Sequence, residues 1–99
     1  MVFDVLAEPN RRRILDELRA GERPVGDLVA LLGVSQPAVS KHLKVLRTAG
    51  LVEVRGDRQR RLYRLQPRPL REVDDWLAPY RERWSSALDA LETHLEDNP

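Results

Sequence analysis

The feature that most constrains this chain is a helix with a recognisable signal at each end, over residues 36–48. Ser35 can accept hydrogen bonds from the first free N–H groups, and Pro37 stands in the first turn, where a missing N–H is tolerated. Gly50 is free to take the positive φ that often ends a helix. The stretch therefore predicts one helix with well-defined ends.

The predicted helix has two unlike faces. Val39, Leu43 and Leu46 recur at helical spacing and form an apolar side. The other side is polar and cationic, without an acidic residue: Gln36, Ser40, Lys41, Lys44 and Arg47. A helix of this kind suits a position with its back on a domain and its front in a DNA groove, and a solvated surface helix is the alternative interpretation.

A second, shorter helix is predicted immediately before the first. Pro24 stands near its start and Gly33 at its end, so that only Gly33 and Val34 separate it from Ser35. Two helices joined by so short a glycine-containing turn form a helix-turn-helix, here over about residues 24–49.

The segment from Leu28 to Val52, with the run LLGVSQPAVSKHLKVLRTAGLV, resembles the core of ArsR-type (ArsR/SmtB-like) winged helix-turn-helix repressors. The similarity extends from about Phe3 to Leu95. The resemblance implies a mainly α fold with a small β-hairpin, pairing through terminal helices, and a bacterial DNA-binding regulator.

After Gly50 the pattern changes from helical to alternating, which predicts a hairpin, the wing, over about residues 51–65. Residues 56–59 are predicted to form its turn, and the second strand is expected at 61–65. The wing is rich in arginine, the side chain that narrow minor grooves attract, although a hairpin end that only increases solubility is the alternative. The wing arginines proposed for DNA are Arg55, Arg58, Arg60 and Arg61.

Charge is divided unevenly along a chain whose net charge is only +1. Residues 35–64 hold eight cations and two acids, a balance of +6, whereas residues 72–99 hold eight acids and two cations, a balance of −6. One part of the molecule can therefore attract phosphates while another repels them. A further run, Arg11 to Arg13, is interpreted chiefly as a solvated face, with a phosphate contact as the alternative.

The C-terminal region carries a long amphipathic stripe from Leu70 to Leu95. Pro79 lies inside it, and two helical segments are predicted, at 70–78 and 79–95. A chain of 99 residues cannot bury this whole stripe together with the apolar segment at residues 1–7, so we expect a second copy to cover it, over about residues 69–96. Packing of residues 1–7 on their own domain is the alternative for that segment.

The sequence gives little support for catalysis or for metal binding. Cysteine is absent, no phosphate-binding glycine loop or metalloprotease motif occurs, and the only histidines are His42 and His94. His94 has Glu92, Glu96 and Asp97 nearby, but one histidine cannot reproduce the ligand spacing of metal-sensing relatives. We therefore predict no enzyme activity, no metal site and no cofactor. No apolar run is long enough to span a membrane and no signal peptide begins the chain, so we expect a cytoplasmic protein.

These observations together predict a single domain over residues 1–99, a dimeric winged helix-turn-helix that is mainly α with a small β-hairpin. Its predicted function is that of a homodimeric repressor on double-stranded DNA with a near-palindromic operator. Two alternatives are a sensor of the same fold, gated by a metal or by a small-molecule effector near Trp76–Trp84, and a protein-interaction module that no longer binds DNA.

The predicted DNA-binding residues are Ser35, Gln36, Pro37, Ser40, Lys41, His42, Lys44, Arg47, Arg55, Arg58, Arg60 and Arg61. The predicted dimer residues are Phe3, Leu77, Tyr80, Trp84, Leu88, Leu91 and Leu95.

Overall fold

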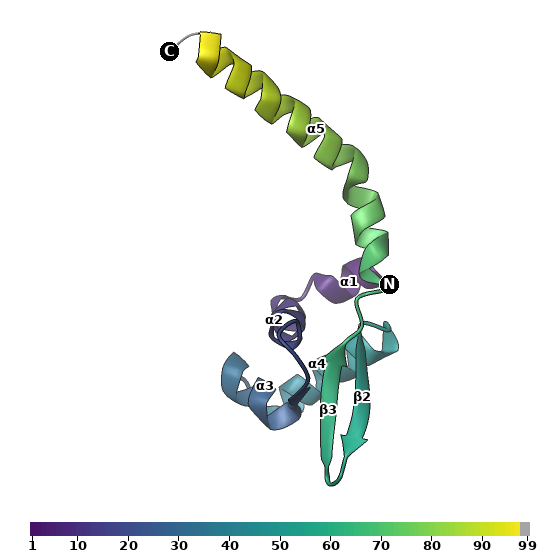
Figure 1. The fold of residues 1–99 in the computed structure, drawn as a ribbon. Helices are drawn as coiled ribbons and strands as arrows, with labels where there is room; N and C mark the ends of the chain where they lie inside the picture. The colour runs from purple at the N-terminus through teal and green to yellow at the C-terminus, as the bar shows by residue number, and fades with distance from the viewer. Residues whose placement is uncertain (98–99) are drawn as a thin grey trace.

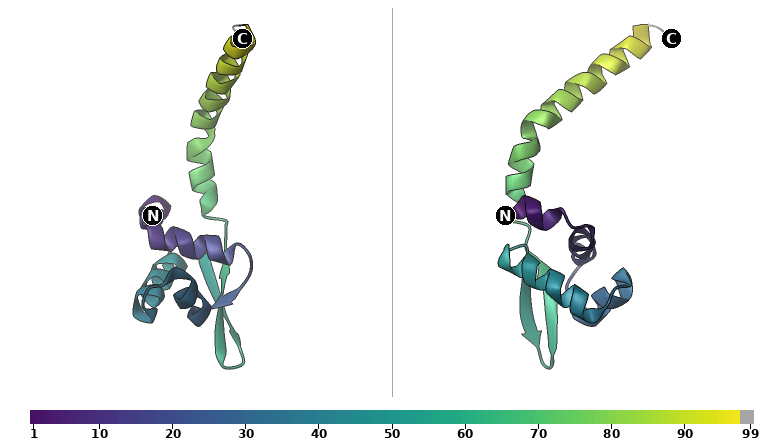
Figure 2. Two further views of the ribbon diagram at one scale, coloured as in Figure 1. Left: turned by 90° about the vertical axis from the view of Figure 1, so that its left-hand side faces the viewer. Right: turned by 180° about the vertical axis from the view of Figure 1, so that it is seen from behind.

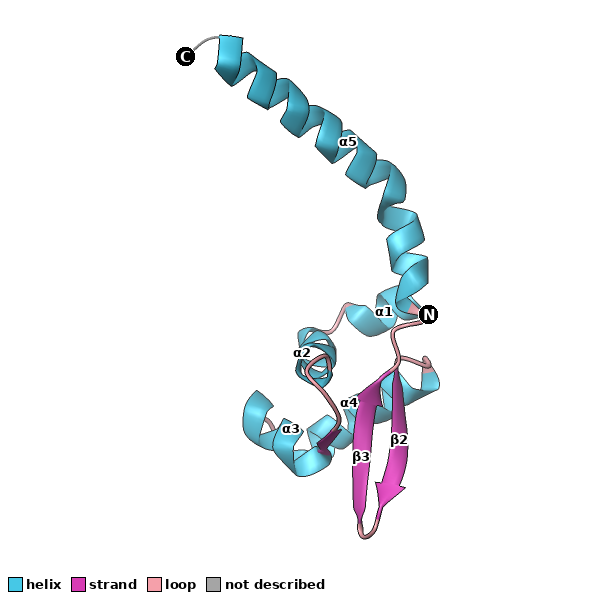
Figure 3. Cartoon of the chain, in the orientation of Figure 1, coloured by secondary structure: helices cyan, strands magenta, loops and turns pink. Residues whose placement is uncertain are grey.

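The computed structural model describes residues 1–97 and shows a mainly helical chain with one small antiparallel sheet (Figure 3). This architecture confirms the predicted fold class. The helices are α1 (Val2–Leu6), α2 (Pro9–Leu18), α3 (Val25–Leu32), α4 (Gln36–Thr48) and α5 (Leu70–Asp97). The strands are β1 (Arg23–Pro24), β2 (Val52–Asp57) and β3 (Arg60–Leu65).

The helix-turn-helix forms as the end signals predict. Gly33 closes α3 in the left-handed conformation, with φ of 70°. The Ser35 hydroxyl accepts a hydrogen bond from the Ala38 N–H at 3.3 Å, which satisfies one of the free donors of α4. Gly50 follows α4 with φ of 76°, where a residue with a Cβ atom would be strained. The ends of α4 are therefore determined locally.

The core lies where α2, α3, α4 and the sheet meet, in the part of the molecule that we call the body (residues 2–65). Val39, Leu43 and Leu46, the predicted apolar face of α4, are fully buried there. Ile14 and Leu28 join them from α2 and α3, both without exposed surface. The apolar back of α4 is thus fixed, and its front is left facing outward.

The sheet differs from the prediction in two ways. It has three strands in the order β1-β3-β2, because Arg23 and Pro24 pair with Tyr63 and Leu62 of β3. The turn is also shorter than predicted, because Asp57 pairs with Arg60 and leaves a two-residue connection. A two-residue strand containing a proline has no alternating pattern, so sequence reasoning missed it.

The C-terminal stripe forms one helix, α5, and the predicted division into two segments is wrong (Figure 1). Pro79 removes a single backbone N–H, and the helix bends without ending. The Arg81 guanidinium bridges the bend, since it donates to the Asp74 carbonyl at 3.2 Å and pairs with the Asp74 carboxylate at 2.8 Å. We call this helix the arm, because it projects away from the body and stretches the molecule to 63 × 26 × 21 Å (Figure 2).

Candidate nucleic-acid interface

The front of α4 presents a polar, cationic surface to solvent. Gln36, Ser40, Lys41, Lys44 and Arg47 are all exposed, as the helical pattern predicts. Within residues 1–97, neither lysine nor Arg47 has an acidic partner. Positive charge that the protein itself leaves uncompensated is the property that attracts a phosphate backbone.

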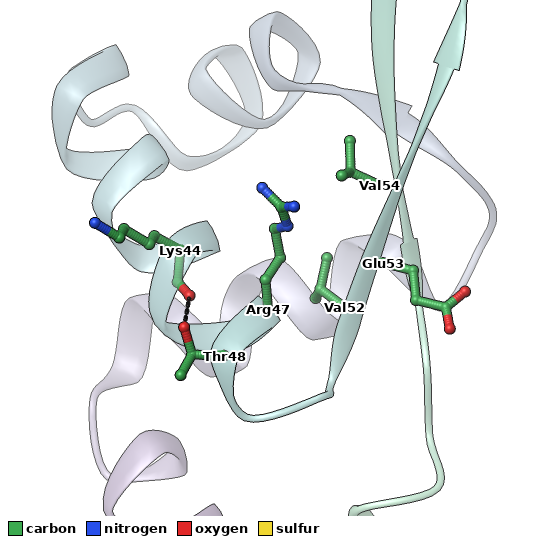
Figure 4. Close-up of a pocket in the computed structure, with 6 residues that line it drawn as sticks. All are labelled: Lys44, Arg47, Thr48, Val52, Glu53 and Val54. Atoms are coloured by element: carbon green, nitrogen blue, oxygen red, sulfur yellow. Dashed lines mark hydrogen bonds between the residues drawn. The ribbon is translucent and has the colours of Figure 1, made fainter.

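A groove separates α4 from the wing strand β2 and has a volume of about 570 Å³. Figure 4 shows Arg47 extending from α4 into this space, with Val52 and Val54 on the strand side. Glu53 points away from the groove in the same view. The lining of the groove therefore combines two cationic residues, Lys44 and Arg47, with the two valines, and the carboxylate of Glu53, which also lines it, is turned outward.

The tip of the wing is formed by arginines in unequal environments. Arg58 begins the two-residue turn with φ of 59°, a position that glycine usually occupies in such hairpins. Arg60 pairs with Asp57 at 3.3 Å, with both side chains exposed. Alternation along β3 places Arg61 on the same face as Tyr63, the face that packs on the core. Arginines thus extend from both faces of the hairpin end.

Two predicted DNA-binding residues, Arg55 and His42, lie in surroundings that differ from those of the free cations on α4. Arg55 lies on the face of β2 opposite Val54, where its guanidinium bonds both oxygens of the Glu22 carboxylate at 2.9 and 3.0 Å. This hydrogen bond lowers the pKa of Glu22 and raises that of Arg55. His42 lies off the polar front of α4, and its Nδ1 atom is buried without a hydrogen-bond partner. Glu22 was missed because its partner is 33 residues away in sequence.

Ser35 and Pro37 help to start α4, the helix that carries the site. Both side chains are exposed at the start of α4, and the Ser35 hydroxyl is used as the helix cap. A second cluster braces the outer face of the wing: Arg64 and Gln66 both donate to the Glu53 carboxylate, and the Gln66 hydrogen bond is the main cause of the lowered pKa of Glu53. These contacts join the two strands of the wing on the side to which the Glu53 carboxylate is turned, away from the groove.

Comparisons with known proteins agree on one family. Residues 8–54 match the family described as bacterial regulatory protein, arsR family. The chain is 48% identical to the HTH-type transcriptional regulator Rv2034 of Mycobacterium tuberculosis, over 87% of this chain and 78% of that protein. The chain belongs to the ArsR family. Because this family consists of transcriptional regulators, the prediction that the chain is not an enzyme is confirmed.

Two further relatives of this ArsR-family chain are a transcriptional repressor and a homodimeric DNA-binding domain. The transcriptional repressor SdpR of Bacillus subtilis is 32% identical over 88% of this chain and 97% of its own length. The homodimeric winged helix-turn-helix DNA-binding domain of Mb0332 from Mycobacterium bovis has a solved structure with a TM-score of 0.66 to this one. It is 30% identical, over 82% of this chain and 75% of that one.

In this ArsR-family chain, most of the residues predicted for a dimer contact are exposed on the arm, α5. Trp84 keeps 55% of its surface exposed, and Leu88 keeps 65%. Phe3 of α1 meets the arm, with its ring 5.7 Å from that of Trp76 in an edge-on contact, and Trp76 lies 5.2 Å from Tyr80. Tyr80, Leu91 and Leu95 are also exposed, whereas Leu77 is half-buried. One apolar stripe thus runs from α1 along the arm.

Residues 1–97, the part of the chain that the structure describes, contain neither a cluster of metal ligands nor a helix suited to crossing a membrane. No group of three or more His, Cys, Asp or Glu side chains in that range could hold a metal ion. In the same range, no helix combines the length and the apolar character that crossing a membrane requires.

Proposed function

We propose that this ArsR-family regulator is a homodimeric repressor in which residues 1–99 act as one winged helix-turn-helix unit on a near-palindromic DNA operator. The observation that carries the proposal is the uncompensated cationic front of α4 next to an arginine-rich wing. The similarity to a named repressor and to a homodimeric DNA-binding domain supports it. A regulator of this kind would work on the chromosome, in the cytoplasm of a bacterium.

In the proposed complex, α4 enters the major groove. Gln36 and Ser40 stand near its N-terminal end, where recognition helices contact base edges; Lys41 follows Ser40 directly, and Lys44 lies about one turn after it. Arg47 would contact the phosphate backbone from the groove between α4 and β2. The wing would contribute Arg58, Arg60 and Arg61 at the flanking minor groove, and DNA contacts by Arg55 and His42 stay predictions.

The proposed dimer uses the arm and α1. Pairing two copies would cover the exposed stripe, which includes Phe3, Tyr80, Trp84, Leu88, Leu91 and Leu95, with Leu77 at its half-buried edge. A symmetric dimer also presents two recognition helices to half-sites that lie about 34–36 Å apart, one turn of DNA. Binding of a small-molecule effector near residues 76–84 stays a prediction. In that region the rings of Trp76 and Tyr80 pack on each other.

The test is selection of duplexes from a random DNA pool, followed by fluorescence-anisotropy titration of the selected sequence. We expect paired half-sites, a Lys44→Ala variant that binds every duplex more weakly, and a Gln36→Ala variant with an altered base preference. One lost base contact corresponds to about 1–3 kcal/mol. Arg71→Ala, which removes an exposed cation from the arm, is the charge-matched control and should bind like wild type. Selection of no sequence by the wild-type protein would contradict the proposal.

A further inference from the structure

Three consecutive arginines, Arg11 to Arg13, stand near the start of α2. Cations at a helix N-terminus oppose the helix dipole, which favours negative charge there. The arrangement therefore needs a favourable contact elsewhere, and the structure provides one for two of the three side chains.

Arg11 and Arg12 donate hydrogen bonds to the C-terminal end of α1. The Arg11 Nε atom lies 2.6 Å from the Val5 carbonyl oxygen, and its Nη2 atom lies 3.3 Å from that of Asp4. The Arg12 Nη1 atom lies 2.7 Å from the Leu6 oxygen and 3.3 Å from that of Ala7. Two guanidinium groups thus bind four successive carbonyls at a helix end, where most carbonyls lack a partner within the helix, although the Asp4 carbonyl also accepts from the Ala7 N–H.

The helix that they hold, α1, belongs to the body and contacts the arm. It has five residues, too few to be stable as an isolated helix. Val2 and Val5 are buried against the body, while Phe3 packs edge-on against Trp76 of the arm. Figures 1 and 2 show α1 between α2 and the start of α5. Leu70 and Val73 at the start of the arm also pack on the core, so the orientation of the arm relative to α4 depends in part on where α1 is held.

We propose that Arg11 and Arg12 are positioning residues that fix α1, and through it the angle between the arm and the body. The inference rests on the proposed homodimer: in a dimer joined by the arms, this angle sets the separation of the two α4 helices. Their guanidinium groups act within the chain, on the α1 carbonyls, rather than on DNA phosphate. Operator spacing is then determined partly by residues that touch neither the DNA nor the partner.

The experiment uses the full chain with Arg11→Gln, Arg12→Gln and the double variant. The matched control is Arg13→Gln, since Arg13 belongs to the same run but, among residues 1–97, bonds only the Asn10 side chain, within α2. The probe is the duplex that wild-type protein selects from a random pool, together with versions whose half-sites are one or two base pairs closer or farther apart. A single half-site duplex reports the binding of one protomer.

We expect the double variant to bind the duplex of native spacing about tenfold more weakly, because each lost hydrogen bond involves a charged donor. Its preference among the spacings should flatten, while its affinity for the single half-site matches wild type. The near-UV circular dichroism of the Phe3–Trp76 contact should weaken in parallel. The Arg13→Gln protein should show none of these changes.

An unchanged spacing preference and an unchanged near-UV spectrum in the double variant would overturn the inference. If the double variant does not fold, Arg12→Gln decides, because the Arg12 contacts lie at the exposed surface. If wild type selects no paired half-sites, the proposed function fails instead. The near-UV comparison then still tests whether the two arginines hold α1 on the arm.

Discussion

The body and the arm place the same kinds of apolar residues at the same helical spacing, but in opposite environments. In the body, Val39, Leu43 and Leu46 of α4 keep at most 1% of their surface exposed. In the arm, Trp84, Leu88 and Leu91 keep more than half of theirs. Periodicity therefore shows that a helix has an apolar face, and only the surrounding elements decide whether the chain itself can cover that face.

This contrast separates two sources of stability. The body packs four helices on a sheet and should fold as one chain, whereas the arm gains most of its burial only when a second copy is present. Substitutions in α4 and α5 should consequently be detected by different measurements.

The largest expected effect comes from the body. Leu46→Ala removes a fully buried side chain from α4 and should lower the free energy of unfolding by about 2–5 kcal/mol in chemical denaturation. Leu88→Ala is the control, and at concentrations where the protein is monomeric it should change that free energy by less than about 0.5 kcal/mol. Equal losses in the two variants would remove the distinction between body and arm.

The next effect concerns the arm. Trp84→Ala should weaken dimerisation by about 2–4 kcal/mol, because a large aromatic side chain at the centre of the stripe is a typical hot spot. Sedimentation equilibrium measures the dissociation constant, and denaturation of the dilute protein should be unaffected. Glu82→Ala, on the opposite face of α5, should leave the dimer intact. A Trp84→Ala protein that remains as dimeric as wild type would show that the stripe is not the contact.

The wing tip should reveal a conflict between folding and binding. Arg58→Gly removes the backbone strain of an arginine in the left-handed region and should raise the free energy of unfolding by up to about 1 kcal/mol. The same change should weaken DNA binding and reduce the slope of log affinity against log salt by about one. Gln59→Ala, in the same turn, is the uncharged control. If Arg58→Gly binds DNA as tightly as wild type at all salt concentrations, the tip does not contact the duplex.

The smallest effect is the response of the body to acid. Because Arg55 donates to Glu22, the folded state holds the pKa of Glu22 below its ordinary value of 4.5. The ion pair therefore contributes full stability above that pH, and the contribution is lost as the pH falls through the lowered pKa. Carbon NMR titration should show that Arg55→Met returns Glu22 to its ordinary pKa. The titration of Glu53 should not move, because its partners are Gln66 and Arg64.

Local signals in the sequence were sufficient for the helix-turn-helix. Ser35, Pro37 and Gly50 act on their immediate neighbours, so the bounds of α4 could be predicted without knowledge of the fold. The apolar back of α4 was equally readable from its spacing. What could be predicted in this region depends on interactions within a few residues.

The errors involve partners distant in sequence or compensating contacts. β1 exists because β3 pairs with it, and two residues carry no pattern of their own. The ion pair between Arg55 and Glu22 could not be predicted, because the approach of Glu22 depends on the folded sheet. At Pro79 the rule that proline interrupts a helix was applied too strictly, since Arg81 supports the bend through Asp74.

The two-residue strand β1 has a consequence for solubility. It occupies the middle of the edge of β3, at Leu62 and Tyr63, which would otherwise offer unpaired N–H and C=O groups to a strand of another molecule. Pro24 has no N–H to offer, so β1 is itself a poor template for further strands. The edge is closed by a proline rather than by another layer of structure. At this edge, β1 should reduce the edge-to-edge aggregation to which small exposed hairpins are prone.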